Sequence, residues 1–531
     1  MNEPAPPSTR RFLGLRSTAA ITLLSRLLGL ARDVAVASLL GLADGGVLDA
    51  FVTAFRLPNF VRRLVAEGTL TAGFLPEFVA LADRAPDLAW RLARTAMAHV
   101  WWRLGAVVAV AEAGCLLAMW WLGGDTGWSL ALGLSAVMLP YIVLIATAAV
   151  VAEMLRGLGE FRTPALLPVW LNVVWLAAIW LAAGRFPDKP VAQAYTMAWA
   201  ILLAGVVQIV AQLPRLRAFG WRWRQPARRH SDMPTSRLLG PTVLAATGLM
   251  APQVNALVDG LTGWLLSGTS ASFPLEPGAA AATYLGERLL MFPVGLIGIT
   301  VAVVVYPTLA RHSARRQGEL VFDALLASVR LVLLLAVPAT FGLVLLAVPL
   351  TRLLFEHGDF TAEDTHRTAA MIQAYAVGIW AQCVLPVVVR SFYALRQYQT
   401  PVLVGVAAIL SNALLNVVLV FTVGETGLGL ATSLTAALHV VVLLALASHV
   451  FQQRAQSMQP LVVTAVKTAA VSAAMCLAGW GTLRGSESLD LPGSDVVAVA
   501  LPLAVCLAVY FLLAWFVMPA ELALLRDRRS G

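Results

Sequence analysis

The stretch from residue 25 to residue 76 reads SRLLGLARDVAVASLLGLADGGVLDAFVTAFRLPNFVRRLVAEGTLTAGFLP, and it limits the folds open to this chain. Its two apolar segments are long enough for helices, yet charged side chains interrupt both. Placing one arginine at the centre of a membrane helix costs about 2.5–3.5 kcal/mol, so such residues persist where they face water, each other or carboxylates. The stretch therefore predicts helices that line a wet, positively charged cavity. The charged residues are Arg26, Arg32, Asp33, Asp49, Arg56, Arg62, Arg63 and Glu67.

The spacing of these charges predicts a shared face on each helix. Asp49, Arg56 and Arg63 follow one another at intervals of two helical turns, so they form one stripe. Arg26 and Asp33 share a face of the first helix by the same reasoning, whereas Arg32 is predicted to point elsewhere and to take another partner. The alternative is that these charges are buried ion pairs that fix helix register.

The composition indicates a membrane protein built from helices. The chain has 531 residues, of which 59% are hydrophobic and only 13% are charged. About fourteen apolar runs have the length of about 20 residues that a helix needs to cross the hydrocarbon layer. We predict an all-α polytopic protein in which these runs are the transmembrane helices. They lie near 18–41, 47–80, 93–122, 129–155, 164–184, 191–214, 237–266, 281–310, 322–348, 370–395, 401–423, 427–451, 460–482 and 495–518.

The basic residues orient the chain and do not indicate nucleic acid. The net charge is +9, but the arginines alternate with the apolar runs and do not gather in one basic domain. With a cytoplasmic N-terminus, the outer connections hold few basic residues, which places both termini inside. Those few are Arg185, Lys189, Arg352, Arg367 and Arg484.

A repeated sequence pattern suggests that the chain consists of two related halves. Residues 156–174 read RGLGEFRTPALLPVWLNVV and residues 396–418 read RQYQTPVLVGVAAILSNALLNVV, so Thr-Pro leads into an Asn-bearing helix in both. We predict two six-helix pseudo-repeats around a central cationic cavity, although chance recurrence is an alternative. The predicted parts are a cytoplasmic tail 1–16, an N-terminal lobe 17–217, a basic loop 218–236, a C-terminal lobe 237–451, two additional helices 452–518 and a basic tail 519–531.

Two residue counts narrow the chemistry. The lysines are Lys189 and Lys467, and neither belongs to a phosphate-binding GxxxxGK loop, so ATP hydrolysis by that route is excluded. The four cysteines fall singly within apolar runs, without the spacing of metal ligands or a disulfide framework. We expect no cofactor and no metal.

The second half carries its own polar groups. Glu287 and Arg288 lie at the entrance of an apolar run that Pro293 is expected to kink, and Arg288 is the natural counterpart of the first-half arginines. Asp259, Asn412, Asn416 and Thr432 could supply oxygen ligands to a cation. Interhelical amide hydrogen bonds are the favoured alternative for these four residues.

The chain resembles the MurJ/MviN lipid II flippases, which are part of a larger superfamily of multidrug and oligosaccharidyl-lipid exporters. The resemblance covers most of the chain and rests on SRLLGLARD, on LDAF followed by FRLPNFVRRLVAEG and FLP, on YLGERLLMFPVGLIG, on LFEHGDFTAEDT and on FYALRQYQTPV. Family positions associated with activity match at Arg26, Arg32, Asp49, Arg62 and Arg288. Asn416 stands where a carboxylate would strengthen a sodium site.

The resemblance implies a bacterial inner-membrane protein of peptidoglycan biosynthesis. It would move undecaprenyl-diphosphate-linked disaccharide-peptide to the outer leaflet by alternating access, working as a monomer among membrane lipids, with other cell-wall proteins as candidate partners. Guanidinium groups pair with phosphate oxygens, so we predict that Arg26, Arg32, Arg62 and Arg288 bind the diphosphate. Asp33, Asp49, Arg56, Arg63, Glu67 and Glu287 would support them. The membrane potential is the expected driving force, with an ion gradient as a second candidate.

Three other classes of protein stay open. An integral-membrane enzyme acting on polyprenyl phosphates would need metal-binding acids or a histidine base, and the one acidic group that could serve, Glu356, Asp359, Glu363 and Asp364, is predicted to be a solvated outer loop. An exporter of another polyprenyl-linked glycan or of drugs is the second alternative. A scaffold for cell-wall synthesis that transports nothing is the third.

Overall fold

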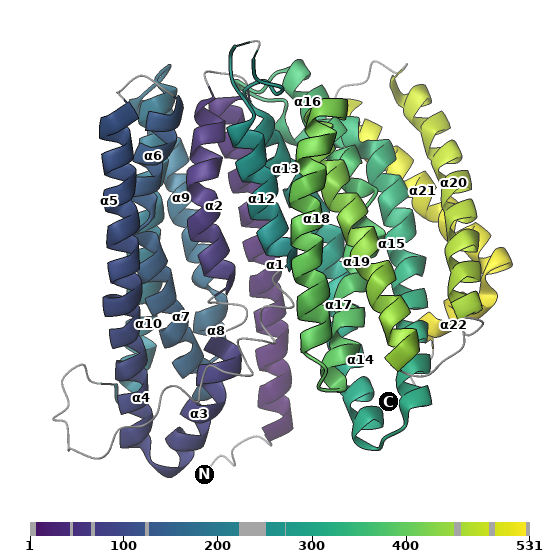
Figure 1. Cartoon of the computed structure of the whole chain (residues 1–531), viewed down its shortest axis with the longest axis horizontal. Helices are drawn as coiled ribbons and strands as arrows, with labels where there is room; N and C mark the ends of the chain where they lie inside the picture. The colour runs from purple at the N-terminus through teal and green to yellow at the C-terminus, as the bar shows by residue number, and fades with distance from the viewer. Residues whose placement is uncertain are drawn as a thin grey trace. The chain divides into compact units, whose positions relative to one another are not determined.

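The structure is a computed structural model, and its described residues are almost entirely helical (Figure 1). It describes residues 7–42, 46–64, 70–122, 127–221, 251–270, 272–450, 458–487 and 494–526. Glu67 and most of the predicted loop 218–236 lie outside these ranges. The chain divides into two compact units, Met1–Ala246 and Thr247–Gly531, and each is described separately.

Unit 1 consists of helices connected by short turns. In chain order they are α1 (Pro7–Leu40), α2 (Val47–Leu64), α3 (Leu70–Arg84), α4 (Pro86–His99), the π-helix η2 (Val100–Leu104), α5 (Gly105–Leu122), α6 (Gly127–Met138), α7 (Tyr141–Gly157), α8 (Arg162–Ala165), α9 (Leu167–Arg185) and α10 (Pro190–Ala218).

Unit 2 has the same character. Its helices are α12 (Ala251–Leu265), α13 (Ala279–Pro293), the π-helix η4 (Val294–Ile299), α14 (Thr300–Ala314), α15 (Gly318–Phe355), α16 (Ala362–Ala376), α17 (Ile379–Ala394), α18 (Gln399–Val423), α19 (Thr426–Val450), α20 (Gln459–Glu487), α21 (Ser494–Val517) and α22 (Pro519–Arg526).

Where the structure describes them, the apolar runs predicted from the sequence are largely helical, and residues 237–250 of one run lie outside the described residues. Within the described residues, 10 helices are long and apolar enough to cross a membrane, or up to 11 if the bent pair α16 and α17 counts as one span. The arginine-bearing helices α1 and α2 are not among them, and neither is the short helix α12. The charges of α1 and α2 dilute the apolar signal that such a test measures. The all-helical, multi-span architecture is therefore confirmed.

The two units repeat one pattern of helix pairing. In unit 1, α1 packs on α9, α9 on α10, α10 on α7, α2 on α6, and α5 on α6. In unit 2 the helices at the corresponding places pair in the same way: α12 with α18, α18 with α19, α19 with α17, α13 with α16, and α15 with α16. The first and fifth spans of each six-helix set are thus neighbours. This pairing decides which polar side chains can meet.

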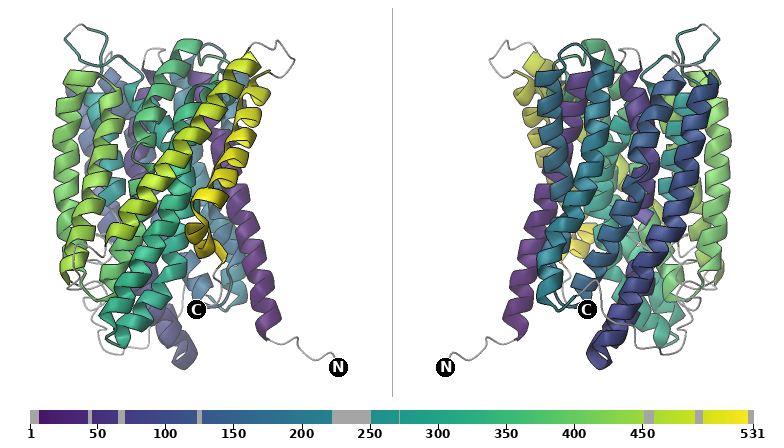
Figure 2. Two further views of the ribbon diagram at one scale, coloured as in Figure 1. Left: turned by 90° about the vertical axis from the view of Figure 1, so that its right-hand side faces the viewer. Right: turned by 90° about the vertical axis from the view of Figure 1, so that its left-hand side faces the viewer.

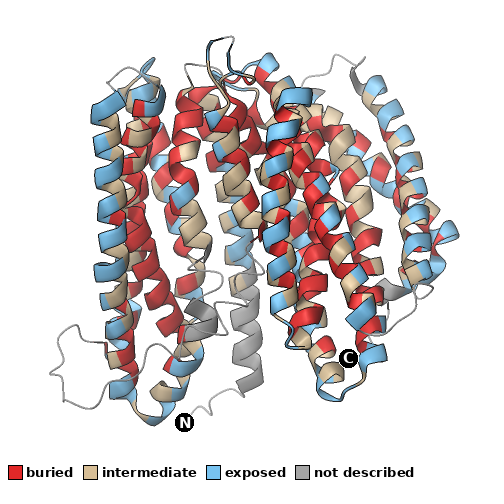
Figure 3. Ribbon diagram, in the orientation of Figure 1, coloured by how far each residue is buried: buried red, intermediate tan, exposed pale blue. Residues whose placement is uncertain are grey.

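Burial follows the lipid-facing and protein-facing sides of these helices (Figure 3). The continuous span made of α4, η2 and α5 is the most exposed of these spans, with only 6% of its apolar window buried, and Trp102, Trp120 and Trp121 are exposed on it. In contrast, 78% of the window that spans α6 and α7 is buried. In a membrane protein an exposed apolar face is the lipid contact, so α6 and α7 form the interior of unit 1.

The π-helix η4 follows the proline at which a kink was predicted. Pro293 ends α13, and the backbone continues through η4 into α14. A Cβ atom on Gly298 would lie 2.7 Å from the backbone of Cys383, so glycine is what lets η4 approach α17 closely. A proline and a π-helical turn are both common causes of helix bending.

The two C-terminal spans belong to unit 2 and pack on α15 (Figure 2, left). Arg330 of α15 donates from Nε to Thr464 Oγ1 at 2.9 Å and pairs with Glu521 at 3.4 Å. Glu521 lies in α22, so residues 519–526 of the predicted C-terminal tail are instead a packed helix. The prediction failed there because a short basic segment does not reveal one buried acid that a distant arginine will bind. Residues 7–16, predicted as a tail, likewise begin α1.

The acidic segment LFEHGDFTAEDT is a helix junction. Helix α15 ends at Phe355, Gly358 takes a positive φ of 61°, and Thr361 is the N-cap of α16. Thr361 and Asp364 form a reciprocal capping box, in which each side chain accepts from the other residue's backbone N–H. The acids predicted to lie in a solvated loop are therefore divided between the junction and the first turn of α16, where Asp364 is buried and caps the helix.

Candidate functional site

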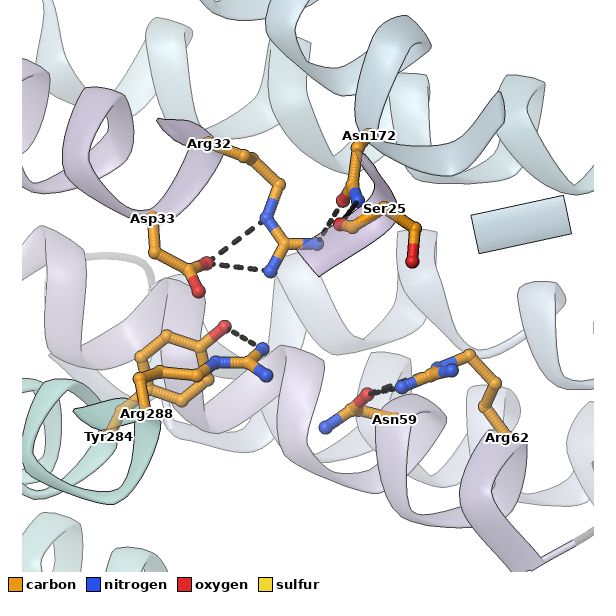
Figure 4. A network of polar contacts seen from close by, with 8 residues as sticks. All are labelled: Ser25, Arg32, Asp33, Asn59, Arg62, Asn172, Tyr284 and Arg288. Atoms are coloured by element: carbon orange, nitrogen blue, oxygen red, sulfur yellow. Dashed lines mark hydrogen bonds and ion pairs between the residues drawn. The ribbon is translucent and has the colours of Figure 1, made fainter. Parts of the chain in front are cut away.

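The strongest polar cluster of unit 1 surrounds Arg32 on α1 (Figure 4). Arg32 and Asp33 are each only 5% exposed. The guanidinium donates to Asp33 Oδ1 from Nε at 3.0 Å and from Nη2 at 2.6 Å, and Nη1 donates to Asn172 Oδ1 at 3.0 Å. Its carbon lies 4.4 Å from the centroid of the Trp175 ring. All of these partners come from α1 and α9.

Helix α9 holds this cluster in place. The Asn172 amide nitrogen donates to the backbone carbonyl of Ser25 at 3.0 Å, so one side chain contacts both the arginine and the helix that carries it. Trp175 is buried and makes edge-on contacts with Phe51 and Phe55 of α2. The aromatic contacts fix the face on which the guanidinium stacks, which is a favourable geometry for a cation and a ring.

The predicted partners on α1 were wrong. Asp33 was expected to share a face with Arg26 and to leave Arg32 for another group, but the ion pair joins Arg32 to Asp33. The guanidinium of Arg32 is long enough to fold back onto the neighbouring carboxylate. Arg26 is exposed, and the described part of the chain offers it no acidic partner. Arg32 is thus a neutralised, buried cation, and Arg26 is the accessible one.

Helix α2 carries the remaining charges of unit 1. Asp49 and Arg56 are 1% and 6% exposed, whereas Arg62 and Arg63 are half-buried. Arg62 donates from Nε and Nη2 to the Asn59 side-chain oxygen, at 3.2 and 3.0 Å. No acidic residue in the described ranges pairs with Arg62, so its positive charge is not cancelled locally. Figure 4 shows this pair beside its helix.

Arg288 of unit 2 is also held by a neutral group. Its guanidinium donates to the hydroxyl of Tyr284, one turn earlier on α13, and lies 4.6 Å from the centroid of that ring. Arg288 is half-buried. The preceding residue of α13, Glu287, lines a pocket within unit 2. The phenol hydroxyl of Tyr284 thereby helps to orient the guanidinium of Arg288.

A second polar cluster lies entirely within unit 2 and is centred on Asp259 of α12. Asp259 is 0% exposed. Its Oδ1 accepts from the amide nitrogens of Asn412 and Asn416 on α18, at 2.6 and 2.7 Å. Its Oδ2 accepts from the Tyr375 hydroxyl of α16 at 3.1 Å and from the Thr432 hydroxyl of α19. Four helices therefore converge on one carboxylate.

The structure brings together all four residues predicted for a cation site, but as hydrogen-bond partners. Both amides face Asp259 with nitrogen, the end that repels a cation, and each carboxylate oxygen already accepts two donors. This arrangement is the interhelical hydrogen bonding that was the favoured alternative. Two participants were not predicted, Tyr375 and, in the adjoining pocket, His439. No sequence pattern distinguishes them from ordinary buried residues.

The acidic group considered for an enzyme does not form a metal centre. Within the described ranges, no set of three or more His, Cys, Asp or Glu side chains is placed to hold a metal ion. Glu356 accepts from Thr365 at 2.7 Å and pairs with Arg352, while Asp364 caps α16. These acids have structural partners.

Comparisons with known proteins agree with this architecture. The family model described as lipid II flippase MurJ matches residues 36–490. A probable lipid II flippase MurJ of Vibrio cholerae serotype O1 is 33% identical over 446 residues, covering 80% of each chain. A probable lipid II flippase MurJ of Rhizobium meliloti is 30% identical over 522 residues, covering 95% of this chain and 94% of the relative.

A solved structure shares the fold. A lipid II flippase MurJ in an inward closed conformation superposes with a TM-score of 0.73 at 22% identity, covering 94% of this chain and 98% of that one. The family model covers most of the chain, including the arginine-bearing helix α2 and the Asp259 cluster. The chain belongs to the lipid II flippase MurJ family.

Proposed function

We propose that this protein is a lipid II flippase of the bacterial inner membrane. It moves the diphosphate-linked peptidoglycan precursor from the cytoplasmic to the outer leaflet without changing it chemically. The precursor's prenyl tail can remain in the hydrocarbon, whereas its diphosphate and sugar-peptide head cannot enter it unaided. The protein must supply a charged, hydrated route for the head. Half-buried arginines at membrane depth are the feature that supports this role.

The observation that carries the proposal is the state of Arg62. Its guanidinium is oriented by the neutral Asn59 amide and keeps its charge, so it can bind a phosphate oxygen without first breaking an ion pair. Arg288 is likewise oriented by a phenol hydroxyl. We assign diphosphate contact to Arg62, Arg288 and the exposed Arg26. Arg32 has a different role, because binding a phosphate would require it to leave Asp33.

The driving force follows from the charge of the cargo. Outward movement of an anion runs with an inside-negative membrane potential and gains about 2.3 kcal/mol per charge per 100 mV. We propose alternating access of the two units as the transport mechanism and a cytoplasmic location for both termini. The repeated helix pairing within the units supports the first proposal, because internal repeats are common in secondary transporters.

Lipid II accessibility in cells tests the proposal. The native protein is depleted, and variants are judged by how much lipid II a membrane-impermeant lipid II-cleaving enzyme reaches from outside. Arg62→Gln removes a charge-assisted contact worth about 1.5–3 kcal/mol, so we expect at least about a tenfold fall in export at limiting substrate. The protein should still insert at its normal level.

Arg311→Gln is the matched control, because Arg311 is an exposed arginine at the end of α14. It should export normally. Equal export by the Arg62 and Arg311 variants would contradict the binding role of Arg62. Covalent change of labelled lipid II on incubation with purified protein would identify an enzyme, and normal lipid II topology after depletion would exclude the flippase function.

A further inference from the structure

One arginine of unit 2 holds the start of α13. Arg367 of α16 donates from Nη1 to the backbone carbonyl of Pro277 at 3.0 Å, and from Nε and Nη2 to the Glu425 carboxylate at 3.2 and 2.8 Å. The side chains of Arg367 and Glu425 are only 14% and 18% exposed. Glu425 lies in the turn between α18 and α19. We call Arg367, Glu425 and the Pro277 carbonyl the Arg367 clamp.

Helix α13 begins without a capping side chain of its own. Its N-cap is Gly278, whose φ of 101° favours glycine and which has no side-chain oxygen to offer the first turn. The first four residues of the helix, Ala279 to Ala282, are each 0% exposed. Contacts with neighbouring elements therefore set where α13 begins, and the Arg367 clamp grips the residue directly before the N-cap.

The same face of α16 seats the middle of α13. Arg367, Met371 and Tyr375 follow one another at intervals of four residues, so they share one face of α16. A Cβ atom on Gly286 would lie 3.1 Å from Met371 Cγ and 3.1 Å from Tyr375 Cδ2. The Tyr375 ring is buried, and its hydroxyl donates to Asp259 at 3.1 Å. The clamp and the Gly286 contact thus fix the register of α13 against α16.

The other end of α13 is held by α17. The Cys383 thiol donates to the backbone carbonyl of Pro293 at 3.8 Å, just before the close approach of η4 to the same helix. Arg288 lies between these contacts, two residues after Gly286. The hydroxyl that orients its guanidinium belongs to Tyr284, which is also part of α13. The place of the guanidinium within unit 2 therefore follows the place of α13.

We propose that Arg367 is a positioning residue for Arg288. The Arg367 clamp sets the height and rotation of α13 on α16, and the helix transmits that setting to the guanidinium that meets the diphosphate. Only this diphosphate contact rests on the proposed function. An arginine is required because its planar fork binds a carboxylate with two nitrogens while the third donates to a carbonyl. A lysine offers one nitrogen and cannot hold both groups in this geometry.

Hydrogen–deuterium exchange of the full-length protein in lipid nanodiscs tests the clamp without reference to transport. The reporter is the start of α13, where the Ala282 N–H donates to the Gly278 carbonyl at 2.8 Å. We expect these amides to exchange at least about tenfold faster in Arg367→Lys, because local opening becomes easier. Arg352→Lys is the matched control, since Arg352 pairs with Glu356 at 3.5 Å at the end of α15. It should leave exchange in α13 unchanged.

Lipid II transport in vesicles tests the positioning. The rate is measured against lipid II concentration for Arg367→Lys in the wild-type background and in Arg288→Gln. We expect the apparent KM to rise about threefold or more with the maximal rate little changed, because a displaced guanidinium binds the diphosphate less well. In Arg288→Gln the same change should have no further effect, since the group that it positions is absent. A merely structural arginine would impair both backgrounds by the same factor.

Two further changes keep the test informative if Arg367→Lys does not fold. Gly286→Ala displaces α13 from α16 at the seat, so it should raise the apparent KM in the wild type and not in Arg288→Gln. Its control is Gly342→Ala in α15, where an added Cβ meets nothing within 4 Å. The double variant Arg367→Gln with Glu425→Gln removes the clamp and leaves no carboxylate unpaired, and it should behave like Arg367→Lys.

The outcomes separate this inference from the proposed function. Unchanged exchange at the start of α13 in Arg367→Lys would overturn the proposal, and so would an equal rise in apparent KM with and without Arg288. In either case a wild type that moves lipid II would keep its function. A wild type that moves no lipid II would reject the flippase function, while faster exchange in Arg367→Lys would still show that the clamp holds α13.

Discussion

The two units hold a buried aspartate in the same kind of place, with different electrical consequences. Asp33 lies on α1 and Asp259 on α12, the first span of each unit, and an amide of the fifth span is present in both clusters. Asp33 is neutralised by Arg32, which Asn172 and Trp175 hold in position. Asp259 has four donors from amide and hydroxyl groups, and the lining of its pocket includes no arginine or lysine.

The difference indicates a division of roles. An ion pair that is fully buried is costly to open, because either partner would be left as an uncompensated charge. The Arg32 cluster is therefore a permanent part of unit 1. A carboxylate held by neutral donors can change its protonation state and keep its neighbours. The Asp259 carboxylate is held by hydrogen bonds in place of an ion pair, and three changes test this contrast.

The largest expected effect comes from Arg32→Met, which leaves Asp33 buried and charged without its partner. We expect a loss of about 3–5 kcal/mol in the free energy of unfolding. The measurement is the denaturation midpoint of the purified protein in lipid nanodiscs, together with the yield of membrane-inserted protein. Arg26→Met, on the exposed side of the same helix, is the control and should be near wild type.

Removing both charges extends this test. The double variant Arg32→Met with Asp33→Leu leaves no uncompensated charge, so most of the lost stability should return. If the single variant is as stable as wild type, Arg32 is not the structural cation that its contacts indicate. If the double variant is stable and still exports lipid II, neither charge is needed for transport.

The second-largest effect is expected in Asn416→Asp, whose folded state should need a bound cation for full stability. The substitution places a second carboxylate against Asp259, and two acids at this distance cannot both ionise unless a cation or proton joins them. Sodium should then raise the denaturation midpoint, with a gain in the free energy of unfolding of about 2.7 kcal/mol at 100 times its dissociation constant. The wild type should show no such response.

Asn172→Asp is the matched change in unit 1. There the new carboxylate meets the guanidinium of Arg32, so added sodium should have no effect on stability. If sodium stabilises both variants, or neither, the two clusters do not differ in whether a positive side chain balances the aspartate.

The smallest expected effect comes from Thr432→Val, which deletes one of the two donors to Asp259 Oδ2. A hydrogen bond to a charged group contributes about 1.5 kcal/mol or somewhat more to stability. The free energy of unfolding at neutral pH, measured by denaturation in lipid nanodiscs, should fall by that amount. Thr422→Val, at an exposed threonine of α18, is the control. An equal loss in Thr432→Val and Thr422→Val would show that the hydroxyl's contact with Asp259 contributes nothing to stability.

The sequence identified which polar residues lie within the apolar helices. It was less informative about which of those residues contact one another. Charges inside apolar runs have few explanations, so α1, α2 and the set of Asp259, Asn412, Asn416 and Thr432 could be singled out. Helical spacing predicted that Asp49 and Arg56 share one face of α2, and both are buried. It failed for Arg32, because a spacing rule treats side chains as rigid and ignores how far a guanidinium reaches.

Partners supplied by distant helices were beyond sequence reasoning. Tyr375 and His439 look like ordinary residues of buried helices, and Glu521 looks like part of a basic tail. Each gains its role from a residue far away in the chain: Asp259 for Tyr375 and Arg330 for Glu521. Such contacts depend on helix rotation and offset, which hydropathy does not encode.

The amino-acid sequence by itself determined that this is a helical membrane protein with charges that need water or partners, because the cost of an ion in hydrocarbon leaves no other solution. Only the tertiary structure decided which charges are cancelled and which are kept. That outcome depends on a few ångströms between side chains of different helices, and packing sets those distances.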